Sequence, residues 1–155
     1  MRIEGPEELL QFMELVEVIQ GIRDAMRQYF RNKIREHQFD ITFEMIEVLI
    51  VLWKNDGLNQ QEIADAVRKN KASLTSLIDN LSARNLVSRS PDPRDRRNNI
   101  ISLTNDGKAY QKKVTPVIRE FYETFRDDFP ALELDQINKL LARFYQQIKA
   151  REDNS

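Results

Sequence analysis

Apolar residues recur at three- and four-residue spacing near both ends of the chain, which is the period of an amphipathic helix. The first stretch predicts a long helix over residues 6–35, with Pro6 suited to its first position. Two further stretches predict helices over residues 104–128 and 133–150. Pro116 lies inside the first of these two and should kink it. Both ends of the chain are therefore expected to carry long apolar stripes.

The middle of the chain has shorter amphipathic stretches, which predict three helices between residues 42 and 84. Thr42, Asn59 and Asn70 precede these stretches, and each is a residue type that caps a helix N-terminus with its side-chain oxygen. Asn85 follows the third helix, where a left-handed residue is favoured. The second and third helices are separated by a tight turn, as in a helix-turn-helix.

Two short runs after these helices have the apolar pattern of β-strands. They are residues 86–89 and 100–103, and the ten residues between them are rich in turn formers and in charge. This arrangement predicts a hairpin with an exposed basic tip. The predicted fold is mainly α with a small β-hairpin wing, a winged helix-turn-helix domain flanked by N- and C-terminal helices.

We interpret residues 1–155 as a single domain. Residues 40–105 form the predicted winged helix-turn-helix region that binds DNA, and residues 6–35 and 106–150 form the flanking helices. The apolar stripes of the flanking helices exceed what one small domain needs to bury. We therefore predict that they are dimerisation helices and that the chain is a homodimer.

Composition excludes several classes of protein. The chain has 155 residues, no cysteine and one histidine, so disulfides, thiolate chemistry and a dedicated zinc site are not expected. No apolar run approaches the length of a membrane span, and the N-terminus lacks a signal pattern, so we expect a cytoplasmic protein with no membrane partner. No phosphate-binding loop, nucleophile elbow or credible triad is present. We expect no enzyme activity, no cofactor and no metal.

Charge is distributed unevenly along the chain although the net charge is only −1. Residues 68–113 hold eleven Lys and Arg against four acids, a net charge of +7, and the remainder carries −8. A basic segment in an acidic protein is typical of a face that binds phosphates. A solvated, salt-bridged surface has the same composition, so charge alone does not decide between the two.

Polar residues near the start of the third short helix are the predicted base-reading residues. The second helix of a helix-turn-helix lies in the major groove, where small polar and basic side chains reach base edges. The candidates are Lys71, Ser73, Thr75 and Ser76. They avoid the apolar stripe of the same helix, which should pack on the preceding helix.

The predicted wing carries Arg94, Arg96 and Arg97. Guanidinium groups suit a narrow minor groove, which has a strongly negative potential. Asp95 would repel phosphate if it pointed outward, so we interpret it as a support that holds a neighbouring arginine in position. The wing is thus predicted to bind DNA beside the base-reading helix.

Four segments of the sequence resemble the multiple-antibiotic-resistance regulator (MarR) family. They are residues 57–64, Leu86-Val87, the wing motif of residues 92–97 and the Leu-Thr-x-x-Gly motif of residues 103–107. The resemblance covers about residues 40–110. It implies a homodimer joined through its first and last helices, with Arg97 in the minor groove. Many members carry a long side chain where Ser76 stands, so one contact is lost or moved here.

The resemblance implies a sequence-specific DNA-binding transcriptional regulator, a repressor, that binds a palindromic operator on double-stranded DNA. Members of the family often bind a small aromatic or anionic effector that releases DNA. Five aromatic residues could line such a pocket, although aromatic residues at helical spacing are more often core. They are Tyr29, Phe30, Phe39, Trp53 and Tyr110. The alternatives are an effector-independent DNA-binding or architectural protein, a winged helix that binds protein, and an enzyme.

Overall fold

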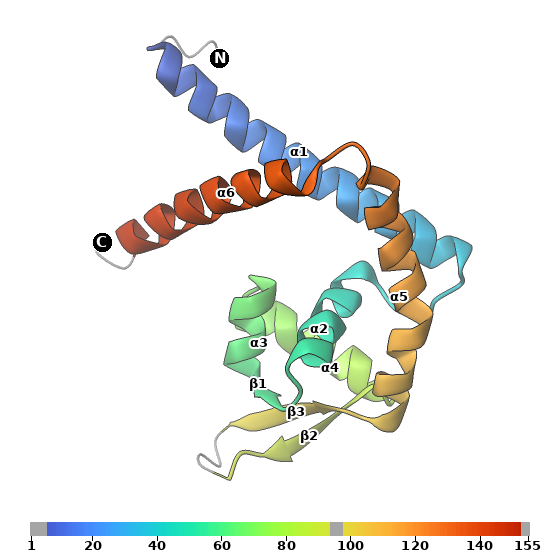
Figure 1. The fold of residues 1–155 in the computed structure, drawn as a ribbon. Coiled ribbons are helices and arrows are strands. Elements are labelled where there is room, and N and C mark those ends of the chain that lie inside the picture. Colours follow the sequence, from blue (N-terminus) through green and yellow to red (C-terminus); the bar gives the residue numbers. More distant parts are fainter. Residues whose placement is uncertain (1–5, 94–97, 153–155) are drawn as a thin grey trace. The chain divides into compact units, whose positions relative to one another are not determined.

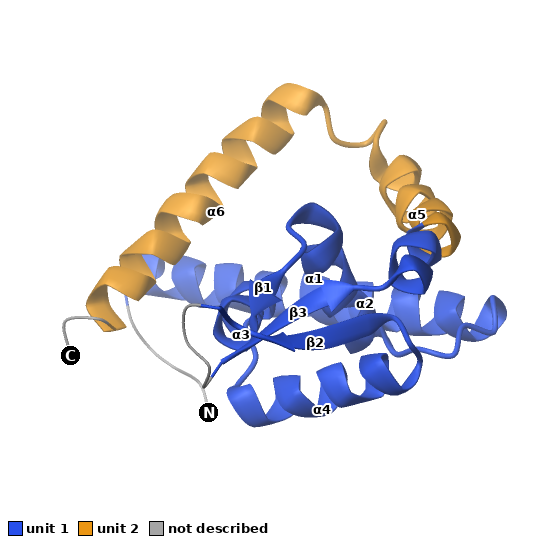
Figure 2. Cartoon of the chain, turned by 90° about the horizontal axis from the view of Figure 1, so that it is seen from below, with its two compact units in different colours: residues 1–111 blue, residues 112–155 orange. Residues whose placement is uncertain are grey.

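A computed structural model describes residues 6–93 and 98–152. The chain forms two compact units, residues 1–111 and 112–155, coloured separately in Figure 2. The nine helices and strands of the described residues are labelled in Figure 1. They are α1 (Glu7–Glu36), α2 (Phe43–Lys54), β1 (Leu58–Asn59), α3 (Gln60–Val67), α4 (Lys71–Ala83), β2 (Val87–Pro91), β3 (Asn99–Leu103), α5 (Asn105–Phe125) and α6 (Ala131–Glu152). The predicted fold, mainly helical with a small β wing, is confirmed.

The helices of the first unit begin where the capping residues predict. The Thr42 hydroxyl accepts a hydrogen bond from the Met45 amide, at 3.3 Å. Asn59 and Glu62 form the reciprocal capping box of α3, with bonds of 2.9 and 2.7 Å. Asn70 accepts from the Ser73 amide at 2.8 Å and caps α4. Each cap satisfies an amide that has no partner within its helix.

The core of the first unit is formed by apolar side chains from α2, α3, α4 and the sheet. The fully buried residues of this unit are Val48, Leu49, Leu52, Ile63, Leu74, Ile78, Leu81 and Ile101. On α4 the buried side chains recur at three- and four-residue spacing, so one face of that helix packs inward and the other stays open to solvent.

The sheet has three antiparallel strands in the order β1-β3-β2. The predicted hairpin is present, with Val87 opposite Leu103 and Arg89 opposite Ile101. The two-residue strand β1 was not predicted, because a run of that length has no periodicity of its own. The predicted left-handed residue after α4 is confirmed, since Asn85 has a φ of 55°.

Several helix ends differ slightly from the prediction. Pro6 is the N-cap of α1 and not its first residue. Helix α5 ends at Phe125, earlier than predicted, and continues through Pro116. Helix α6 extends two residues beyond the prediction at each end. No helix among the described residues is long and apolar enough to cross a membrane.

Candidate nucleic-acid interface

The turn between α3 and α4 is held by its backbone. Arg68 ends α3 in the left-handed conformation, with a φ of 54°. The Lys69 amide donates to the Ala64 carbonyl at 3.0 Å, and Asn70 then caps α4. The Lys69 ammonium also lies 3.2 Å from the Glu47 carboxylate of α2. These contacts fix the start of α4 against α2 and α3, which is the geometry that a helix-turn-helix requires.

The predicted base-reading residues lie on α4 but not on one stripe of it. Lys71, Ser73 and Ser76 are exposed. Thr75 is half-buried, and its hydroxyl donates to the Lys71 carbonyl at 2.9 Å. The Thr75 oxygen is therefore available to a ligand only as a hydrogen-bond acceptor, whereas the two serine hydroxyls remain able to donate.

The wing is formed by β2, β3 and the residues between them. Beyond the last strand pair, Pro91 and Asn99, the Asp92 amide donates a hydrogen bond of 3.0 Å to the Asn98 carbonyl. The predicted groove-binding residues Arg94, Arg96 and Arg97, and the supporting Asp95, lie outside the described residues. Their roles stay predictions from the sequence.

Arg89 of β2 is an interface residue that the sequence analysis missed. Its guanidinium lies 2.5 Å from the Asp79 carboxylate of α4. Strand alternation could have found it, because Arg89 has the same parity as Val87, which is buried against the core. An ion pair thus links the wing strand β2 to α4.

Hydrogen bonds also join the C-terminal end of α4 to the loop between α1 and α2. Arg84 donates to the backbone carbonyl of Asp40 and, at 3.3 Å, to its carboxylate. Tyr110 lies beside this pair, and burial raises the pKa of its hydroxyl above the ordinary value of 10. The Asp40 charge raises that pKa further, while the Arg84 charge opposes the rise.

An open cleft of about 700 Å³ lies beside α4 within the first unit. Its lining comes from α1, the start of α2, the α3–α4 turn and α4. The lining residues are Arg23, Arg27, Glu44, Arg68, Lys69, Asn70, Ser73, Ser76 and Leu77. Four cations against one carboxylate give the cleft a positive charge, so it suits an anion.

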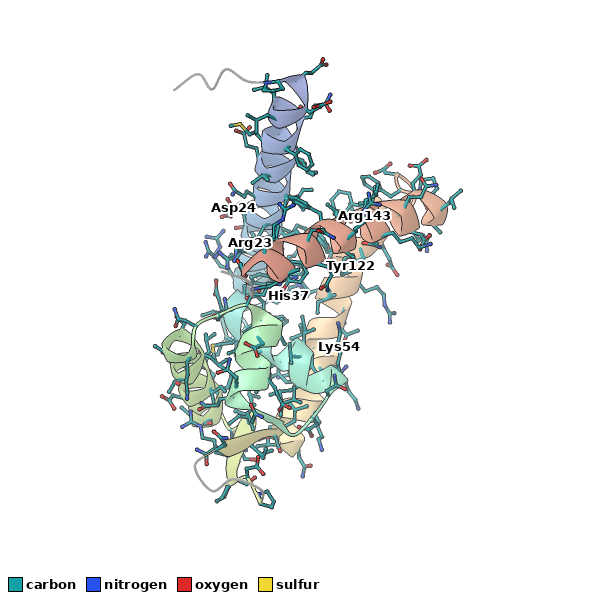
Figure 3. All side chains as sticks on the ribbon, turned by 90° about the vertical axis from the view of Figure 1, so that its left-hand side faces the viewer. Arg23, Asp24, His37, Lys54, Tyr122 and Arg143 are labelled. Carbon is teal, nitrogen blue, oxygen red and sulfur yellow. The ribbon has the colours of Figure 1, made fainter. Side chains whose placement is uncertain are left out.

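The arginines of α1 were not predicted to belong to a site. Arg23 and Arg27 are four residues apart and therefore lie on one side of their helix; Figure 3 labels Arg23. The Arg27 Nε atom is buried and has no hydrogen-bond partner among the described residues. Helical spacing together with the basic Arg68-Lys69 pair was the available signal.

Glu44 is the one acid of this lining. Partial burial acts to raise the pKa of its carboxyl, but stronger combined effects lower it below the ordinary value of 4.5. These are hydrogen bonds from its own amide and from Thr42, and the charges of Arg31 and Lys69. Arg31 lies 3.5 Å from the carboxylate. Glu44 is therefore ionised at neutral pH and forms an ion pair with Arg31.

The five aromatic residues considered for an effector pocket make packing contacts. Phe30 is buried and stacks on Phe43 with ring centroids 5.1 Å apart. Tyr29 packs edge-on against Phe30, as Phe39 does against Tyr110. The Trp53 indole donates to the Gly107 carbonyl at 3.0 Å. Phe30 is therefore a core residue, and the other four are half-buried residues with packing or hydrogen-bond partners. Among the described residues, no group of three or more His, Asp or Glu side chains is placed to hold a metal.

Helices α3 and α4, their tight turn and the following β wing define a winged helix-turn-helix protein. The model of the MarR family matches residues 41–98, which contain α2, α3, α4 and β2. This stretch of the chain therefore matches the MarR family of DNA-binding proteins.

Individual relatives agree with this assignment. The chain is 25% identical over 132 residues to the homoprotocatechuate degradative operon repressor of Escherichia coli, covering 85% of this chain and 88% of that one. It is similar to S. aureus MepR in its DNA-binding conformation, with a TM-score of 0.78 and 27% identity over 86% of this chain and 98% of that one. A MepR–DNA complex gives a TM-score of 0.75 and 28% identity over 85% of this chain and 96% of that one.

Proposed function

We propose that the chain is a sequence-specific transcriptional repressor that binds a palindromic operator as a homodimer. The observation that carries this proposal is the capped helix α4, which presents Ser73 and Ser76 on its open side and is tied to a β wing. Similarity to MepR, which is described in a complex with DNA, supports the same function. The name of the Escherichia coli relative supports repression.

The homodimer is supported by exposed apolar side chains on the flanking helices. Helix α1 exposes Leu9, Phe12 and Ile22, each at 44% or more. Within the second unit, α6 exposes Leu132 and Leu140 at 69% and 57%. Single exposed apolar residues are ordinary, but rows of them along two long helices mark association surfaces. A second copy of the chain is the occupant that we propose.

Selection of bound DNA from random oligonucleotides tests the proposed operator. The expected product is an inverted repeat, because a two-fold dimer presents two identical base-reading helices. Enrichment of a site without internal symmetry would contradict the palindrome, and no enrichment at all would contradict sequence-specific binding.

We also propose that a small anion, such as an aromatic carboxylate, binds the cleft beside α4 and releases DNA. The cleft is open to solvent and is lined by four cations, so it suits a charged ligand that the protein encloses only in part. Arginine is suited to carboxylates because its fork donates two parallel hydrogen bonds. Ser73 and Ser76 belong both to the cleft lining and to the predicted base-reading set. An occupant of the cleft therefore competes for side chains that DNA needs.

Melting curves and gel shifts with homoprotocatechuate, benzoate and inorganic phosphate test this effector site. A ligand that binds the native state raises its melting temperature, and the same ligand should weaken DNA binding. Arg23→Ala and Arg27→Ala should each weaken binding of the ligand roughly tenfold or more, which is the loss typical of a charged hydrogen bond. Lys54→Ala, an exposed cation at the far end of α2, is the matched control. If a probe raises the melting temperature and weakens DNA binding equally in both arginine variants, the ligand binds elsewhere. If none of the probes has either effect on the wild type, the effector-independent alternative is favoured.

A further inference from the structure

Asp79 stands where a DNA-binding helix would be expected to avoid an acid. It lies three residues after Ser76 on α4, so the two side chains share one stripe of the helix. Its side chain is 57% exposed. A carboxylate on this stripe repels phosphates, so its presence beside predicted base-reading residues needs an explanation.

The contact of Asp79 with the wing supplies that explanation. Val87 and Arg89 occupy the same face of β2, and Val87 is buried against the core. Arg89 lies beyond the edge of the core, and its guanidinium meets the Asp79 carboxylate at 2.5 Å. Strand β2 lies beside α4 in Figure 2, and Arg89 is opposite Ile101 of the central strand β3. The ion pair therefore connects the helix to both strands of the wing.

We propose that Asp79 is a positioning residue that acts through Arg89 to set the wing relative to α4. The helix and the wing must reach DNA at the same time, so the distance between them has to match the spacing of adjacent grooves. The pair fixes that distance at the middle of the wing strand. An exposed ion pair contributes little to folding stability, so its value here is geometric. The inference rests on the proposed contact between the wing and DNA.

A simpler reading assigns Arg89 directly to a DNA phosphate. The two readings predict opposite results for Asp79→Asn. If Asp79 positions the wing, the variant binds DNA more weakly although it has lost a negative charge. If Arg89 binds phosphate directly, the variant binds more tightly, because its arginine is released and a repulsive charge is gone.

The experiment measures the binding of wild type and variants to a duplex selected by the wild type, at several salt concentrations. Asp79→Asn should weaken binding roughly fivefold or more, as expected for a coupled pair. It should also flatten the slope of log K against log salt by about 0.9 for each phosphate contact that the wing loses. Asp79→Glu, which keeps the ion pair, should recover most of the affinity. The double variant with Asp79→Asn and Arg89→Gln should lose little more DNA affinity than either single variant.

Glu36→Gln is the matched control, because it also removes one negative charge and one ion pair. The Glu36 carboxylate pairs with Lys33 at the end of α1. This control should leave both affinity and salt slope unchanged. Equal or tighter binding by Asp79→Asn, with a steeper salt slope, overturns the inference. If Asp79→Asn does not fold, Asp79→Ala provides the same comparison, because it also removes the carboxylate and leaves Arg89 in place. Absence of a selected site for the wild type would be a failure of the proposed function and not of this inference.

Discussion

Gly107 illustrates how one residue determines a junction in this fold. A Cβ atom at this position would lie 2.0 Å from the Leu86 carbonyl oxygen and 3.2 Å from the Leu103 side chain. The Gly107 amide donates to the Thr104 hydroxyl at 3.0 Å, and its carbonyl accepts from Trp53. The Leu-Thr-x-x-Gly motif therefore has a physical basis: only glycine lets the start of α5 approach the Leu86 backbone, just before β2, this closely.

Gly107→Ala is expected to destabilise the protein. Overpacking of this kind typically costs about 1–3 kcal/mol, and the clash here is with rigid backbone, so the cost should reach the upper part of that range. Gly21→Ala is the matched control, because a Cβ there meets nothing within 4 Å. As an exchange within a helix, it should stabilise by about 0.5–1 kcal/mol. Urea unfolding of both variants measures the difference, and a Gly107→Ala protein as stable as wild type would contradict the proposed close approach.

At the scale of elements, the sequence predicts features that depend on neighbouring residues, such as the helices. It does not predict features that depend on contacts between distant segments. Thr42, Asn59 and Asn70 cap helices through their own side chains, so three residues of sequence are enough to recognise them. Strand β1 exists only because β3 pairs with it. The arginines of α1 line the cleft only because α1 lies beside the α3–α4 turn, so their helical spacing indicates a shared side of the helix but not the cleft itself.

The wing is the element whose proposed role can be tested by substitution. Arg97→Ala should weaken binding, with a larger effect on sites that have A·T-rich flanks, whose narrow minor groove attracts a guanidinium. Asp95→Ala should partly reproduce this effect, because the arginine loses its support.

On α4, Ser73→Ala should instead change which bases are preferred, at a cost of about 1–3 kcal/mol per lost contact. Dissociation constants on matched sites at one salt concentration separate these outcomes, and tighter binding by Asp95→Ala would show that its supporting role is wrong.

At the scale of the whole molecule, charge and apolar surface are divided between regions of the chain. Residues 68–113 carry a net charge of +7, while the rest of the chain carries −8. The exposed apolar rows of α1 and α6 lie outside this basic segment. Such a division is expected of a protein that holds nucleic acid with one region and a second copy of itself with others.

The central claim is that two copies of the chain read two half-sites on one face of DNA. The most direct measurement compares binding to the selected duplex with binding to duplexes that carry five extra base pairs between the half-sites, with the stoichiometry determined by sedimentation. Half-site centres should lie about 10 base pairs apart, so five more turn the second half-site to the opposite face. We predict two protomers per duplex and an affinity that falls roughly tenfold or more on insertion, because one half-site's base contacts are lost. One protomer per duplex, or an affinity unchanged by the insertion, would contradict the account.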